Sequence, residues 1–151
     1  MALQALCLFD ALGPSFDEEV GAFLQDSVNY VDLGWHGRPR AKLVRLARGL
    51  VTGARANRER YDQLLRDAVP GWSLERMQPV DRNILRLGLY ELLEVPDTPF
   101  QVVLNEAIEL ARLFGGTESS AFVNGVLDGV RRRLDGFATP ADGTSREVTD
   151  V

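Results

Sequence analysis

Apolar residues recur along this chain at spacings of three and four, which is the pattern of helices with one buried face. The clearest stretch is residues 99–114, whose apolar stripe consists of Phe100, Val103, Leu104, Ala107, Ile108 and Ala111. Thr98 is placed to cap this helix, and Gly115 to end it in the left-handed conformation. No stretch shows the sustained alternation of a strand. The pattern therefore predicts an all-α protein.

Other segments with helical spacing lie on both sides of this stretch. We expect further helices at residues 2–12, 16–32, 39–54, 55–68, 79–95 and 118–134. Segment 79–95 is apolar around most of its circumference, which predicts a central position in the fold. Ser15 and Thr117 are expected to cap the helices that follow them. No capping residue precedes segment 2–12, so either the true start lies upstream or an N-terminal extension has been lost.

The charge of the chain is unevenly distributed. The net charge is -5, yet residues 38–66 carry nine Lys and Arg against two acidic residues, Glu59 and Asp62. Residues 1–37 carry six acidic residues and no Lys or Arg. The basic segment includes a helical face made of Arg38, Lys42, Arg45 and Arg48. This basic face is either a solvated surface or a site of phosphate contact.

Little in the composition points to chemistry. Cys7 and His36 are the single cysteine and histidine among the 151 residues, too few ligands for a zinc site and without an activating context for a nucleophile. We expect no cofactor, no metal and no enzymatic activity. The sequence has no apolar run of the roughly 18 residues that a bilayer requires and no signal peptide. We therefore expect a protein of the cytoplasm, formed from one domain.

Three strings in the second half of the chain resemble the NusB transcription antitermination family. They are VDRNILRLGLYELL at residues 80–93, VLNEAIELA at residues 103–111 and FVNGVLD at residues 122–128. The similarity is close over residues 80–134 and looser over residues 2–12. It implies a compact bundle of about seven helices in two packed helical subdomains. The expected helical RNA-binding domain spans residues 1–135, followed by a flexible polar tail at 136–151.

The resemblance also implies partners and a function. Family members bind the box A sequence of ribosomal RNA transcripts, best together with the ribosomal protein NusE, and join elongating RNA polymerase to suppress termination. Recognition of single-stranded RNA requires contacts but no chemical step. Family members occur as monomers and as dimers, so a homodimer is one of the expected states.

Carried over to this chain, the resemblance assigns RNA binding to Phe114, Glu118, Phe122 and Asn124. The two phenylalanines also fit apolar stripes, so stacking on bases and packing in the core both stay open. Asp81 matches an acidic position on the NusE-facing surface, or serves the first turn of its own helix. We predict in addition that Lys42 and Arg45 contact RNA phosphates.

The chain departs from the family pattern at several positions. The arginine-rich N-terminal arm is absent from the sequence, Cys7 replaces a tyrosine, Ala121 a basic residue, and Val69 an aromatic residue seen in some relatives. Each lost stacking platform would weaken RNA binding by roughly 1–3 kcal/mol. The alternative function is therefore a protein-interaction module that keeps the NusE surface but no longer reads RNA.

Overall fold

The computed structural model describes residues 1–31, 34 and 36–138, and within these ranges it contains helices and no strands. The all-α prediction is confirmed. The α-helices are α1 (Ala2–Leu12), α2 (Val20–Gln25), α3 (Val28–Val31), α4 (Ala41–Ala56), α5 (Arg58–Ala68), α6 (Pro79–Glu94), α7 (Phe100–Phe114) and α8 (Ser119–Ala138). Two short 3-10 helices, η1 (Gly13–Asp17) and η2 (Leu74–Arg76), follow α1 and α5.

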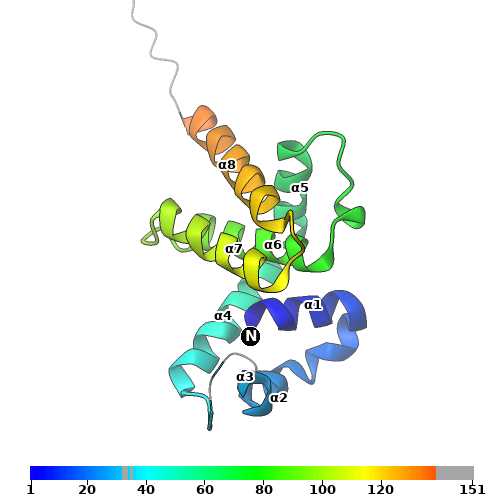
Figure 1. Ribbon diagram of the computed structural model, residues 1–151, viewed down its shortest axis with the longest axis vertical. Coiled ribbons are helices and arrows are strands. Elements are labelled where there is room, and N and C mark those ends of the chain that lie inside the picture. The colour runs from blue at the N-terminus through cyan, green and yellow to red at the C-terminus, as the bar shows by residue number, and fades with distance from the viewer. Residues whose placement is uncertain (32–33, 35, 139–151) are drawn as a thin grey trace, which may run out of the picture.

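Helix α6 occupies the centre of the fold, as its apolar circumference predicts. Ile84, Leu85 and Leu89 are fully buried, and α6 contacts α1, α4, α5, α7 and α8. Helices α5 to α8 form one group and α1 to α4 the other, with α1 and α4 lying against α6 where the two groups meet (Figure 1). Burial on every side explains why this helix lacks a polar face exposed to solvent.

The expected single helix at residues 16–32 is wrong. The chain instead forms η1 and two short helices, α2 and α3, and the described residues contain eight α-helices, close to the expected number of about seven. Asp26 takes an extended conformation at the break, and its Oδ1 accepts a hydrogen bond from the Val28 amide at 3.0 Å. Ser15 does not cap α2, because its hydroxyl donates to the carbonyl of Leu12. When an Asp side chain accepts a hydrogen bond from the amide two residues later, that bond competes with continuation of the helix.

The last helices also differ from the expected ends. Thr98 does not cap α7 as predicted. Pro99 is the residue that directly precedes this helix, and no side chain caps its first turn. Helix α8 begins at Ser119, two residues after the expected cap Thr117, and continues to Ala138, beyond the predicted boundary at residue 135. The rest of the expected tail, residues 139–151, lies outside the described residues. None of the described helices has both the length and the apolarity needed to span a membrane.

Candidate nucleic-acid interface

A groove lies where the start of α6 meets the turn between α7 and α8. Its volume is about 570 Å³. Its walls are formed by Trp72, Arg76, Met77, Gln78, Val80 and Asp81 on one side and by residues 114–119 and Phe122 on the other. We call it the aromatic groove. It brings together four residues that the sequence singles out, namely Phe114, Glu118, Phe122 and Asp81.

The tight turn at Gly115 sets the spacing of the two phenylalanines. Gly115 is extended, with φ −91° and ψ −176°, so the predicted left-handed conformation is wrong. Close approach explains this glycine instead. A Cβ atom at Gly115 would lie 2.5 Å from the Ser119 side chain and 2.6 Å from the Ala111 carbonyl oxygen. The Ser119 hydroxyl accepts a hydrogen bond from the Gly116 amide at 2.8 Å, which holds the turn closed.

We therefore expect Gly115→Ala to push α8 away from α7. Overpacking of this kind costs about 1–3 kcal/mol, and thermal unfolding will measure the loss. Gly125→Ala is the matched control, because no atom lies within 4 Å of a Cβ added there and alanine favours helix. Equal stabilities of the two variants would contradict the close-approach explanation.

Trp72 is a residue of the groove that the sequence prediction missed. Its ring centroid lies 5.0 Å from that of Phe122 at an interplanar angle of 32°, and 60% of the residue is exposed. Phe114 is 38% exposed and also lines the groove. The available signal was a tryptophan in the Pro70–Gly71 turn after α5, where no helix needs it for its core. Exposed aromatic faces are platforms on which unpaired bases stack.

Asp81 lines the same groove and carries a buried carboxylate oxygen. The residue is only 8% exposed, and its Oδ1 atom is buried without a hydrogen-bond partner among the described residues. A buried acceptor left unpaired costs about 1–3 kcal/mol. The position in the groove places Asp81 beside the RNA-binding candidates as well as in the first turn of α6.

The remaining polar residues give the groove both signs of charge. Arg76 and Glu118 are exposed and both line the groove, and Gln78 adds an amide. A guanidinium group can hold a phosphate, while carboxylates and amides can pair with the edges of bases. The groove thus combines the groups that single-stranded RNA recognition uses.

Three predicted site residues lie elsewhere. Asn124 is exposed on α8, but is not among the residues that line the aromatic groove. Lys42 and Arg45 are exposed on α4. Arg45 lines a separate hollow of about 760 Å³ together with Arg38 and Arg48. The structure therefore supports a basic face on α4 that is distinct from the aromatic groove.

Two of the family departures, Val69 and Ala121, lie close in sequence to residues of the aromatic groove. Ala121 is exposed on α8 next to Phe122. Val69, which replaces an aromatic residue, ends α5 three residues before Trp72. Cys7 and Phe114 line an adjoining hollow of about 500 Å³. Trp72 thus provides an aromatic surface close to the position where the resemblance shows one lost.

A buried network of ion pairs fixes α6 beneath the site. Arg86 donates to both carboxylate oxygens of Asp62 at 2.8 and 2.9 Å and to Asp10 at 3.2 Å. Arg82 and Asn83 also donate to Asp10, at 2.8 and 2.9 Å. Burial raises the pKa of Asp10, but these donors outweigh it, so that the pKa is lowered overall. The network ties α1 and α5 to the helix that carries Asp81.

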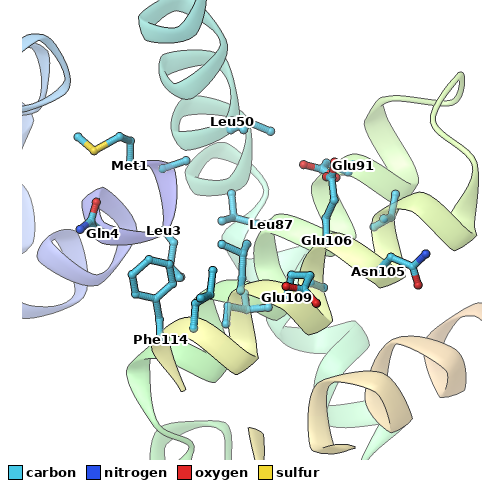
Figure 2. Close-up of a pocket in the computed structure, with 17 residues that line it drawn as sticks. Met1, Leu3, Gln4, Leu50, Leu87, Glu91, Asn105, Glu106, Glu109 and Phe114 are labelled. Carbon is cyan, nitrogen blue, oxygen red and sulfur yellow. The ribbon is translucent and has the colours of Figure 1, made fainter. Parts of the chain in front are cut away.

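A second groove, of about 490 Å³, lies between α1, α4, α6 and α7. Leu50, Leu87, Val103 and Leu110 contribute to its apolar lining. Three glutamates stand along it, Glu91 from α6 and Glu106 and Glu109 from α7 (Figure 2). No Lys or Arg is among its lining residues. We call it the acidic groove.

The acidic groove makes the stability of the fold depend on pH. Burial, together with the neighbouring carboxyl of Glu106, raises the pKa of Glu91 to about 7 from an ordinary value of 4.5. The folded state therefore holds a proton that the unfolded state releases, and stability falls as the pH rises from about 4.5 through 7. We expect Glu91→Gln to remove this fall. Because the groove is open to solvent, we expect this variant to gain about 1 kcal/mol in the free energy of unfolding at pH 8, and less at pH 5.

Urea unfolding of the wild type and of Glu91→Gln at the two pH values measures the effect. Glu59→Gln, on the exposed surface of α5, is the control and should change neither value. The same difference between wild type and Glu91→Gln at both pH values would show that the proton on Glu91 is not the cause.

Comparison with known proteins agrees with the fold and the sequence motifs. The sequence model of the NusB family matches residues 1–132. The transcription antitermination protein NusB of Symbiobacterium thermophilum is 38% identical over 148 residues, which cover 97% of this chain and 95% of that protein. The structure of T. maritima NusB superimposes with a TM-score of 0.67 at 30% identity, covering 91% of this chain and 92% of that one.

A further solved structure contains NusB and NusE, described as antitermination factors in complex with double-stranded RNA. The matched chain has a TM-score of 0.68 at 22% identity and covers 87% of this chain and 91% of that one, which supports the fold. The family comprises RNA-binding antitermination factors without enzymatic activity, so the predicted absence of catalysis is confirmed. By its sequence and its fold, the chain belongs to the NusB family of transcription antitermination proteins.

Proposed function

We propose that this protein binds the box A sequence of ribosomal RNA transcripts in the cytoplasm, together with NusE, and joins the RNA polymerase elongation complex to suppress termination. One observation carries the proposal. The aromatic groove brings the exposed rings of Trp72 and Phe114 together with the carboxyl group of Asp81. The name of the Symbiobacterium relative and the NusB and NusE complex with RNA support it.

In this proposal the groove reads unstacked bases by contact. Bases stack on Trp72, Phe114 and Phe122, and a base amino or imino group donates to the carboxyl group of Asp81. Glu118, just before α8, and Asn124, within it, contact the same RNA strand. Arg76 pairs with the phosphates of this RNA. No bond is made or broken, so binding energy alone performs the function.

NusE would occupy the hollow beside the groove. That hollow shares Phe114 and Val80 with the aromatic groove and is otherwise lined by residues of α1 to α3, including Phe23 and Val28. Val28 is 69% exposed, and an exposed apolar residue on such a surface suits a protein partner. A partner seated there would border the RNA and Asp81, which accounts for tighter RNA binding by the pair.

Equilibrium binding tests the proposal. We expect box A RNA to bind the purified protein more tightly than a scrambled RNA of equal length, and to bind the mixture with NusE more tightly still. In protein–DNA complexes, the affinity for a specific site typically exceeds the non-specific affinity by about three or more orders of magnitude. A smaller difference in affinity between box A and scrambled RNA would already support the proposal. Equal affinity for both RNAs, with NusE still bound, would instead establish the protein-interaction module.

The basic face of α4 should add contacts that ignore base sequence. Reversing two charges, with Lys42→Glu and Arg45→Glu, is expected to weaken box A and scrambled RNA alike and to flatten the dependence of affinity on salt. The slope of log affinity against log salt measures this. Reversal of two exposed residues on α8, Arg132→Glu and Arg133→Glu, changes the net charge by the same amount and serves as the control. An unchanged slope would remove the basic face from the RNA site.

A further inference from the structure

The acidic groove follows helix α7 for most of its length. The lining residues on this helix run from Val103 to Phe114, a distance of about 16 Å along the helix axis. Leu87, Leu110 and Leu113 make the lining apolar. Leu113 is 65% exposed, so the described part of the chain leaves this end of the groove open to solvent. An open apolar groove of this kind marks a contact site for another molecule.

Helix α7 combines apolar and acidic side chains on the face that lines the groove. Glu106, Leu110 and Leu113 follow one another at spacings of four and three, which places them on one face of the helix. Glu109 also lines the groove. A molecule that covers the two leucines therefore meets carboxyl groups as well.

The negative charge of the groove is only partly neutralised within the described chain. Glu106 points toward Glu91 of α6 (Figure 2), and their carboxyl groups share a hydrogen bond, which requires a proton on one of them. Arg112 pairs with Glu109, but no Lys or Arg lines the groove. Met1 also lines it, and burial lowers the pKa of its amino group. A positive group from outside would replace the shared proton and pair with both carboxylates.

We propose that the acidic groove is the docking site for a basic amphipathic helix of a partner protein. Apolar side chains of this helix cover Leu110 and Leu113, and its Lys or Arg side chains pair with Glu91 and Glu106. Helices that dock in grooves present apolar residues at spacings of three and four. RNA is not the occupant, because its phosphates would meet carboxylates. The site thus goes beyond the RNA-binding function proposed above.

An unbiased peptide selection tests the chemistry of the partner. Random peptides of about 12 residues, long enough to span the groove as helices, are displayed on phage and selected on the purified full chain. We expect the enriched peptides to carry apolar residues at spacings of three and four with Lys or Arg beside them. No enrichment, or enrichment of acidic peptides or of basic peptides without an apolar stripe, would overturn the proposal.

Variants of the groove then locate the binding site of an enriched peptide. Fluorescence anisotropy of the labelled peptide measures its affinity for each variant. Glu106→Lys and Leu113→Ser change exposed residues, so both variants should fold, and we expect each to weaken binding at least about tenfold. The controls are Glu59→Lys on α5 and Leu12→Ser at the end of α1. Both controls change exposed residues that do not line the groove, and their affinities should match the wild type.

Three further outcomes would contradict a protein partner in the groove. Groove variants that bind the peptide as tightly as the wild type, or controls that lose as much affinity, would place the peptide elsewhere. Weaker box A binding by Leu113→Ser would assign the groove to RNA. Self-association of the free protein that Glu106→Lys abolishes, measured by sedimentation velocity, would assign the groove to a second copy of the chain.

Discussion

Replacement of Arg86 by methionine is expected to lower the free energy of unfolding by about 3–5 kcal/mol. Arg86 is 3% exposed and makes a two-pronged pair with Asp62 and a further bond to Asp10. Methionine fills the volume but leaves two buried carboxylates with fewer partners. Arg82 and Asn83 still donate to Asp10, whereas among the described residues Asp62 retains only the more distant Arg58. Urea unfolding measures the loss.

Arg58→Met is the matched control for this prediction. Its guanidinium lies 3.7 Å from Asp10 and 3.8 Å from Asp62, but 54% of its side chain is exposed, so the pairs contribute less than about 1 kcal/mol. The wild type should also lose stability as the pH falls below about 4, because Asp10 has a lowered pKa in the fold. Similar unfolding energies for Arg86→Met and the control would mean that the network contributes no more than surface charges do.

The second large effect is expected on RNA binding. The double variant with Phe114→Ala and Phe122→Ala should bind box A RNA more weakly by about 2–6 kcal/mol, since each lost stacking contact removes about 1–3 kcal/mol. Trp72→Ala should lose about as much as either single change, because its ring faces the groove beside Phe122. Titration of a labelled RNA measures each affinity.

Two checks separate binding from folding in these variants. Phe122 is half-buried, so thermal unfolding must show that the variants remain folded at the binding temperature. Val102→Ala shortens an exposed apolar residue of α7 that does not line the aromatic groove, and its RNA affinity should match the wild type. Folded variants that retain full affinity would assign Phe114 and Phe122 to the core.

The sequence was sufficient to predict a helix in two cases. Either the helix has one apolar face, or it is buried on every side. Helix α6 shows why, since burial on all sides demands apolar residues around its circumference and leaves a recognisable pattern. The break at Asp26 was not predicted, because one hydrogen bond to the Val28 amide decides it and leaves no periodic signal. The predicted left-handed form of Gly115 was wrong for a related reason: its close contact with Ser119 depends on how the chain turns from α7 into α8, which leaves no periodic signal.

The candidate site was predictable in part. The motifs found Phe114, Glu118 and Phe122, which lie together, and also Asn124, which does not line the same groove. Trp72 escaped because it lies in a turn and meets Phe122 only through the fold. The Arg86 network escaped as well, because Asp10, Asp62 and Arg86 resemble solvated positions in sequence and become neighbours only when α1, α5 and α6 pack together.

Photochemical crosslinking of box A RNA to the protein tests the central claim most directly. A box A RNA with photoactivatable uridines, bound in the presence of NusE, is irradiated, and mass spectrometry identifies the crosslinked residues. We predict crosslinks at Trp72, Phe114 and Phe122, and their loss when unlabelled box A RNA competes. Crosslinks confined to the basic face of α4, or equally strong with a scrambled RNA, would contradict recognition of RNA in the aromatic groove.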